Sequence, residues 1–453
     1  MPTTPRLTQT TPARTLIVAA LAAGLLAACG GGGGGDSGST SVAAGCDVES
    51  QKSWLRDYML DKYYWSGTSP NPAPAGYATV ADYLDALRFP GDATVPRDRW
   101  SYIQDTASYS QFFGAGKTLG YGLQVNGREL QLPLRARYVE PQSPAALAGI
   151  TRGDTIVSVN GRTAADIVGT NDFSSLSPAK AGDAITVVFN SAAGARSVVL
   201  TAAVYSLVPV STTQVLTLAD GRKAGYLFLK DFVSQAEVPL AQALAEFNKA
   251  GATELILDLR YNGGGLVSTA SVLASMIGGS ADNGRVFATL NFNARNAASN
   301  SSYLFNANAA SPFTRAVVLT GARTCSASEL VVNGLKPHMN VVTIGATSCG
   351  KPFGFVPKDS CGNTYSAVNF ESFNSAGQGR YYDGIAPTCT VAEDFTRALG
   401  DPAEVLAAAA ANYIVNGACP APSSGMQPRP SAFTARQRAA VVEPGDRQGM
   451  WVR

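Results

Sequence analysis

The sequence predicts an α/β domain joined to a β-rich module and a small helical cap. From about residue 223 onward, short apolar runs typical of buried strands alternate with helix-length segments, and we place this domain at 207–419. Between 117 and 206 the pattern changes to short strand-like runs separated by turn residues. Residues 46–116 carry aromatic side chains at helical spacing, which indicates a helical cap with an aromatic core.

The composition excludes several classes of site. The 453 residues hold 35 Lys and Arg, 33 Asp and Glu, and one histidine, His338. A catalytic triad or a common zinc site needs histidines or paired Cys-x-x-Cys clusters, and no such cluster occurs. An enzyme of this composition would use a carboxylate, a lysine or a terminal amine as its base. The near-neutral charge balance excludes a nucleic-acid partner.

The first 45 residues predict export. Residues 1–28 contain a short basic region and an apolar run of signal-peptide length. Leu26-Ala27-Ala28-Cys29 resembles a bacterial lipobox, which implies lipid attachment at Cys29, and 29–45 is a Gly/Ser-rich tether. The alternative is an ordinary secretory signal followed by a cysteine with no special role. At the other end, 420–453 is rich in Pro, Ser, Gln and Arg, and we expect it to be disordered.

The remaining cysteines form an even set in a chain that is expected to be exported. This favours disulfides over metal or redox sites, and six cysteines allow fifteen connectivities. They are Cys46, Cys325, Cys349, Cys361, Cys389 and Cys419.

The β-rich module carries strand patterns at 130–134, 155–159, 184–189 and 197–200, with a short helix from Ser143-Pro144 to Gly149. Together with Tyr121-Gly122-Leu123 and the run 153–161, these segments resemble a PDZ domain. The resemblance implies that a peptide adds as a strand, with its carboxylate on exposed backbone N–H groups. The candidate peptide-binding residues are Gly120, Tyr121, Gly122 and Leu123.

In the α/β domain, apolar periodicity separates strands from helices. The predicted strands are 224–229, 255–259, 316–320 and 341–344, and the predicted helices are 235–250, 266–277 and 326–335.

Three loops that follow strand ends hold the candidate chemistry: 260–265 with three glycines, 324–329, and 350–354. Ser326 opens a helix, where free N–H groups and the helix dipole favour an alkoxide. It is equally a helix N-cap with Glu329 completing a capping box. The glycines alone could form a phosphate-binding turn, and Lys351 alone could be a surface charge.

Together these loops resemble the carboxyl-terminal processing (tail-specific) serine proteases, whose fold is related to the crotonase and Clp protease superfamily. The matching segments are Ser326-Ala327-Ser328-Glu329, Gly350-Lys351 and Leu257 to Leu266, with Asp383 to Pro387 and Gly400 to Pro402 further on. The separation of 25 residues between Ser326 and Lys351 also matches the family. The cap, PDZ module and catalytic region follow in the family's order.

The resemblance implies that Ser326 is the nucleophile and Lys351 the general base. The N–H of Ala327 and that of Gly264 or Gly265 would form the oxyanion hole. No cofactor or metal is expected. Lys351 must be neutral near pH 7, a fall of about three pKa units or ~4 kcal/mol, so we expect it to point inward with no carboxylate in contact.

Two positions depart from the family. Relatives often carry a glutamine where this chain has Phe355, and some carry an acidic residue where it has Pro337. The dyad therefore lacks its usual orienting group. We also hypothesise a disulfide between Cys325 and Cys349, which would join the serine turn to the lysine loop; the alternative is that these cysteines pair elsewhere.

The sequence thus predicts a lipid-anchored serine endopeptidase of the bacterial cell envelope that faces the periplasm or exterior. Its PDZ domain would recruit the C-terminal regions of protein or peptide substrates. The alternative is a non-catalytic peptide-binding lipoprotein on the same fold.

Overall fold

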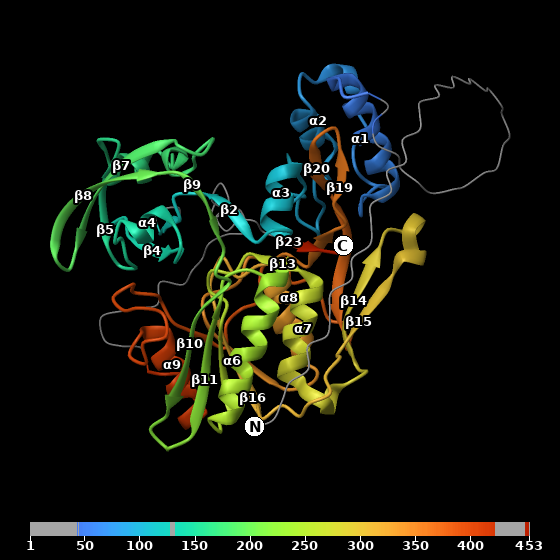
Figure 1. Ribbon diagram of the computed structural model, residues 1–453. Coiled ribbons are helices and arrows are strands. Elements are labelled where there is room, and N and C mark those ends of the chain that lie inside the picture. The colour runs from blue at the N-terminus through green and yellow to red at the C-terminus, as the bar shows by residue number, and fades with distance from the viewer. Residues whose placement is uncertain (1–42, 44, 127–131, 422–448, 453) are drawn as a thin grey trace, which may run out of the picture. The chain divides into compact units, whose positions relative to one another are not determined.

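The computed structural model describes residues 43, 45–126, 132–421 and 449–452 (Figure 1). The expected signal peptide, 1–28, and lipidation site, Cys29, lie outside the described residues, as does most of the expected tether. Among the residues that are described, no helix is long and apolar enough to cross a membrane.

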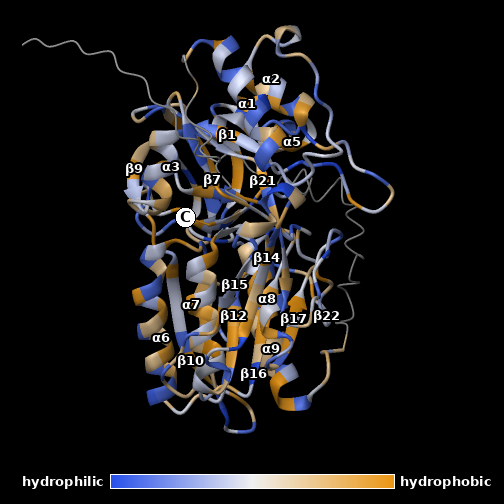
Figure 2. Cartoon of the chain, turned by 90° about the vertical axis from the view of Figure 1, so that its right-hand side faces the viewer, coloured by the Kyte–Doolittle hydropathy of each residue, from blue (hydrophilic) through white to orange (hydrophobic). Residues whose placement is uncertain are grey.

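The α/β domain is built on a six-stranded sheet in the order β10-β11-β12-β16-β17-β22. The strands from β11 onward run parallel, and β10 pairs antiparallel with β11. The central strands are buried along almost their whole length, as expected for a parallel sheet covered on both faces, and Figure 2 shows β12 and β16 as strongly hydrophobic. Their bounds are β10 Val210–Thr217, β11 Lys223–Leu229, β12 Glu254–Asp258, β16 Arg315–Thr320, β17 Asn340–Gly345 and β22 Cys389–Thr390.

Helices cover both faces of this sheet. Side chains of a strand alternate between faces, so Leu255 and Leu257 pack with α6, α7 and α8, whereas Ile256 packs with α9. The helices are α6 Glu237–Lys249, α7 Val267–Gly278, α8 Ala327–Leu335 and α9 Val405–Asn416. The strands and helices predicted for this domain are therefore present, with ends displaced by one or two residues.

A second six-stranded sheet, in the order β13-β23-β18-β21-β14-β15, packs on the same core. Its strand β23 belongs to the segment 420–453 that we expected to be disordered. That expectation is wrong for 449–451, because Met450 and Trp451 are almost completely buried. The bounds are β13 Gly264–Leu266, β23 Gly449–Trp451, β18 Phe353–Phe355, β21 Val368–Asn374, β14 Val286–Phe292 and β15 Ser301–Leu304.

The β-rich module has its own hydrophobic core. The prediction of a strand at 130–134 is wrong for 132–134, where Pro133 has no N–H to donate; the strand begins at Ala136, and 127–131 are not described. Its elements are β2 Lys117–Gly120, β3 Leu123–Val125, β4 Ala136–Val139, α4 Pro144–Leu147, β5 Thr155–Val159, β6 Arg162–Thr163, α5 Ala164–Gly169, β7 Ala184–Ser191, β8 Gly194–Thr201 and β9 Ala203–Ser206.

The cap is helical and aromatic, as predicted. Its core continues onto the α/β domain, since Trp65 and Trp100 pack against Phe353 of β18. The elements are α1 Val48–Lys62, α2 Val80–Leu87, α3 Thr106–Phe113 and β1 Tyr102–Asp105, and β1 pairs with β20 Asn363–Ser366, which pairs with β19 Lys358–Ser360.

A buried ion network anchors the end of β12. Arg260 donates to both carboxylate oxygens of Glu404, at 2.6 and 2.9 Å, and to Asp258 at 3.0 Å. From the β-rich module, Arg152 reaches Tyr261 and Glu393 of the same network. The network therefore fixes the start of the glycine loop and ties it to the neighbouring module.

Replacing Arg260 should destabilise the fold strongly. Arg260→Met would leave two buried carboxylates without their partner, and we expect the free energy of unfolding to fall by about 3–5 kcal/mol in a urea titration. The control Arg56→Ala removes an exposed ion pair with Asp57 and should change it by less than about 1 kcal/mol. Equal effects of the two substitutions would contradict this assignment.

Candidate active site

Ser326 occupies the turn between β16 and α8 in an unusual conformation. Its φ of 60° and ψ of −110° are rare for a residue with a side chain, and the residue is fully buried. Its hydroxyl donates to the carbonyl oxygen of Phe353 at 3.4 Å. A strained residue persists only where its surroundings hold it, and backbone outliers of this kind cluster at functional sites.

The carboxylate of Glu329 holds the serine turn and the lysine loop together. Its Oε2 accepts the backbone N–H of Ser326 at 2.9 Å and that of Lys351 at 2.8 Å. Its Oε1 accepts the N–H of Gly350 at 2.8 Å and the hydroxyl of Ser348 at 2.5 Å. Glu329 thus makes its predicted bond to the helix N-cap. Burial raises the pKa of Glu329, and these four hydrogen bonds lower it.

The side chain of Lys351 is fully buried, as predicted. Burial lowers the pKa of Lys351 well below its ordinary value, while the carboxylates of Asp98 and Glu329 raise it and Arg99 lowers it further. We expected no carboxylate in contact with this amine, and this stays a prediction. The carboxylates of Asp98 and Glu329 act on the amine electrostatically. The Lys351 Nζ also lies 4.0 Å from the ring centre of Phe355, one of the two positions at which the sequence departs from the family pattern that it resembles.

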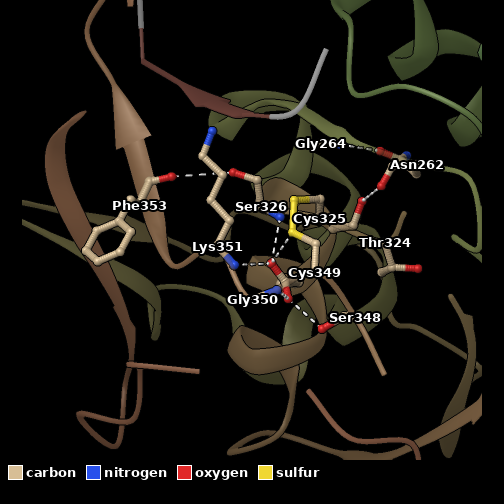
Figure 3. The surroundings of a disulfide bond; sticks show 12 residues. Asn262, Gly264, Thr324, Cys325, Ser326, Ser348, Cys349, Gly350, Lys351 and Phe353 are labelled. Atoms are coloured by element: carbon tan, nitrogen blue, oxygen red, sulfur yellow. Dashed lines mark hydrogen bonds between the residues drawn. A yellow bond between two sulfur atoms is a disulfide. The ribbon is translucent and has the colours of Figure 1, made fainter. Parts of the chain in front are cut away.

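A disulfide joins Cys325 to Cys349, which confirms the hypothesis from the sequence. The N–H of Cys349 also donates to the carbonyl of Thr324 at 3.0 Å. In Figure 3 the side chains of Ser326 and Lys351 extend on the same side of this disulfide. The other described cysteines pair as Cys46–Cys361 and Cys389–Cys419, and disulfides are typical of an oxidising compartment.

The glycine loop lies against the serine turn. Asn262 accepts the N–H of Cys325 with its carbonyl at 3.1 Å and that of Gly264 with its side chain at 2.8 Å. The hydroxyl of Ser328 donates to the same Asn262 carbonyl at 3.0 Å, so it faces the loop. Gly264 and Gly265 have φ values of 112° and 139°, which only glycine adopts readily.

The backbones of Gly264 and Ala327 meet closely. A Cβ placed on Gly264 would lie 3.1 Å from the nitrogen of Ala327 and 3.0 Å from the carbonyl oxygen of Cys325. The structure therefore brings the expected oxyanion-hole segments together beside Ser326. Because the Gly264 N–H already donates to Asn262, Gly265 is the better candidate of the two glycines.

The candidate peptide-binding residues form the connection from β2 to β3. Tyr121 is buried, and its carbonyl accepts the N–H of Ala145 at 2.9 Å. Gly122 has a φ of 74°, and a Cβ there would lie 2.0 Å from the Cβ of Ser143. Leu123 pairs with Val139, while Gly120 ends β2. The turn at Tyr121 and Gly122 thus packs against the start of α4.

The structure also gives the surroundings of His338 and Asp98. His338 bonds to Asp282 and to the carbonyl of Val286, and its ring makes an edge contact with Phe305, so it has a structural environment of its own. Asp98 was not singled out from the sequence. It belongs to the cap, where it accepts from Tyr63 at 2.6 Å, and only the three-dimensional packing places it near Lys351.

Three family models match segments of this chain. The model of peptidase family S41 matches residues 223–391, that of the S41 N-terminal domain matches 50–102, and a PDZ model matches 135–187. Residues 223–391 are thus an S41 peptidase domain. The chain's architecture is the S41 α/β domain with a PDZ domain and a helical N-terminal domain, as the sequence predicted.

The individual proteins to which this chain is similar are carboxyl-terminal-processing proteases and an S41 protease. A carboxyl-terminal-processing protease from a Picosynechococcus strain is 29% identical over 61% of this chain and 63% of its own length. The chloroplastic C-terminal processing peptidase of Tetradesmus obliquus is 30% identical over 52% of each chain. This chain thus spans only about half to two thirds of these relatives. The structure of a Bacteroides fragilis protein described as an S41 protease aligns with a TM-score of 0.63 at 25% identity, covering 80% of this chain and 97% of that one.

Replacing Glu329 should disorder the site. Glu329→Gln keeps the side-chain shape but turns an NH₂ group toward donors, so at least one hydrogen bond is lost; we expect ~2 kcal/mol lower stability and, if the chain cleaves peptides, a fall in kcat of about 100-fold. Urea titration measures the stability, and peptide hydrolysis measures kcat. The exposed Glu246→Gln is the control. Unchanged stability would show that this carboxylate does not organise the site.

Proposed function

We propose that this S41 family member is a serine endopeptidase that cleaves peptide bonds with a Ser326–Lys351 dyad. The observation that carries the proposal is the shared Glu329 carboxylate, which binds the backbone N–H of both residues while Lys351 is fully buried. The proteins that it resembles are carboxyl-terminal-processing proteases, so the favoured substrates are the C-terminal regions of proteins.

In this mechanism the neutral amine of Lys351 accepts the hydroxyl proton as Ser326 Oγ attacks the scissile carbonyl carbon. The hydroxyl must first turn from the Phe353 carbonyl, its acceptor in the structure. Collapse of the tetrahedral intermediate releases the amine product, which takes the proton from Lys351, and leaves an acyl-enzyme on Ser326. Water, activated by the same amine, then hydrolyses the ester and frees Ser326.

Charge that develops on the carbonyl oxygen needs donors already in place. We assign this role to the backbone N–H groups of Ala327 and Gly265. Support comes from the close approach of Gly264 to the Ala327 nitrogen and from positive φ values that exclude other residues. The Cys325–Cys349 disulfide helps to hold this arrangement together.

The PDZ domain would recruit the substrate. We assign its carboxylate to the backbone around Gly120, Tyr121, Gly122 and Leu123, and peptide addition to the edge of β3. The disulfides and the signal-like N-terminal segment support a place in the bacterial cell envelope, with lipid attachment at Cys29.

Substitution of either dyad residue should abolish turnover. Ser326→Ala should lose hydrolysis of a fluorogenic peptide and labelling by a serine-directed phosphonate, and Lys351→Ala should lower kcat/KM about 10²–10⁴-fold because no base remains. The exposed Lys249→Ala is the control. Near wild-type hydrolysis by Lys351→Ala, or a folded wild type that resists the phosphonate, would favour the non-catalytic binder instead.

The pH dependence of turnover should report on Lys351. Activity requires the neutral amine, so it should fall as the pH falls through the pKa of Lys351. The carboxylate of Asp98 favours the charged amine and raises this pKa. Asp98→Asn should therefore lower the pKa further and move the acid limb of kcat/KM to lower pH.

The matched control is Asp282→Asn, whose carboxylate faces His338 rather than Lys351. It should leave the acid limb in place. Lys351 would be excluded as the titrating base if the acid limb of kcat/KM moved to higher pH in Asp98→Asn. It would also be excluded if that limb persisted unchanged in Lys351→Ala.

A further inference from the structure

Strand β23 lies between two of the three loops that build the candidate site, the glycine loop and the lysine loop. The N–H of Gly449 donates to the carbonyl of Gly263 at 3.1 Å, and the N–H of Val452 donates to the carbonyl of Phe355 at 3.0 Å. It runs parallel to β13 on one side and to β18 on the other. Figure 1 shows β23 beside β13, with α3 of the cap close by. A segment about 100 residues beyond Lys351 in sequence thus lies in the site.

The carbonyl of Gly449 lies where a scissile carbonyl would bind. A Cβ on Gly264 would lie 2.3 Å from the Gly449 oxygen and 3.1 Å from the Ala327 nitrogen, so both atoms approach the same point. Gly449 pairs with Gly264 in a parallel ladder. In such a ladder the carbonyl of Gly449 points toward the N–H of the residue after Gly264, which is Gly265. The Gly449 oxygen is therefore directed toward the Gly265 N–H, one of the two proposed oxyanion-hole donors, and lies near the Ala327 nitrogen, the other.

The side chains that follow Gly449 enter separate apolar environments. Met450 is fully buried in the core that contains Ala327, and Trp451 is 1% exposed in the core of the cap. The Trp451 ring packs at 4.5 Å from Phe113 and at 5.7 Å from Phe355. Phe355 is the ring over which the Lys351 Nζ lies, so the tryptophan packs on a direct neighbour of the proposed base.

Little space remains for a side chain at Gly449. A Cβ there would lie 2.6 Å from the Trp451 ring and 2.9 Å from that of Phe355. The segment fits because a glycine is followed by an apolar residue and then by a large aromatic one. These are the features of a peptide recognised by its backbone and by alternate side chains.

We propose that Gly449–Val452 is a tethered competitive ligand of the active site, bound where a substrate strand binds. The same site then selects peptides with a small residue at the carbonyl position, an apolar residue next and an aromatic residue after it. That this segment competes with a substrate rests on the proposed endopeptidase function. That it occupies the site does not.

Binding can be measured without catalysis. The probe is a fluorescein-labelled peptide of residues 445–453, and the protein is the full chain to residue 448 with Ser326→Ala. We expect saturable fluorescence polarisation, competed by unlabelled peptide, with affinity at least tenfold weaker for peptides carrying Gly449→Val or Trp451→Ala. Absence of saturable binding to a protein folded by circular dichroism, or equal affinity of all three peptides, would overturn the proposal.

Kinetics test the same segment in the intact chain. Gly449→Val and Trp451→Ala should each lower the KM for a fluorogenic peptide at least threefold with little change in kcat, because the internal competitor is weakened. Val238→Ala, an exposed substitution on α6, is the control. If the chain ending at residue 448 does not fold, these full-length variants decide alone. An unchanged or higher KM would overturn the proposal.

The two proposals fail differently. If the labelled peptide binds as predicted but neither the full chain nor the released variants hydrolyse peptides or react with a phosphonate, the endopeptidase function is wrong and the peptide site stands. If Ser326-dependent hydrolysis is present but the peptide does not bind, the tethered ligand is wrong and the enzyme stands.

Discussion

The site depends on one buried carboxylate. Glu329 accepts hydrogen bonds from the serine turn and from the lysine loop, and no other described interaction joins the backbone N–H groups of Ser326 and Lys351 through a single atom. The Cys325–Cys349 disulfide adds a covalent link between the same two segments. A buried acceptor with four donors is costly to disturb, since each donor would lose its partner in the protein interior. The relative positions of Ser326 and Lys351 are therefore set by α8 itself, because Glu329 lies in its first turn.

Burial has opposite consequences for the two ionisable groups. It raises the pKa of Glu329 and lowers that of Lys351, so a low dielectric disfavours both charges. Asp98 opposes the effect on the lysine, and it comes from the cap. The cap thus limits how far the amine is neutralised. Phe355 supplies an aromatic face to the same amine and forms part of the environment of Trp451.

The sequence was informative where a local pattern carried the constraint. Periodicity located the strands and helices of the α/β domain, the Ser-x-x-Glu spacing predicted the bond from Glu329 to the Ser326 N–H, and the placement of Cys325 and Cys349 beside the dyad suggested their disulfide. It failed where partners are distant in sequence. Nothing local in a Pro- and Arg-rich segment indicates that Trp451 is buried, because its contacts come from Phe113 and Phe355. The approach of Asp98 to Lys351 was equally invisible, since it requires the cap to be folded onto the α/β domain.

The central claim is that Lys351 is a neutral amine at physiological pH, and direct titration of its Nζ tests this most closely. The protein would be labelled with ¹⁵N on the lysine side chain, and the resonance absent from a folded Lys351→Met variant would be assigned to Lys351. The account predicts that this resonance reports a neutral amine near pH 7 and titrates far below the ordinary lysine range. A Lys351 resonance that remains that of a charged ammonium up to about pH 10, as for an unperturbed lysine, would contradict it.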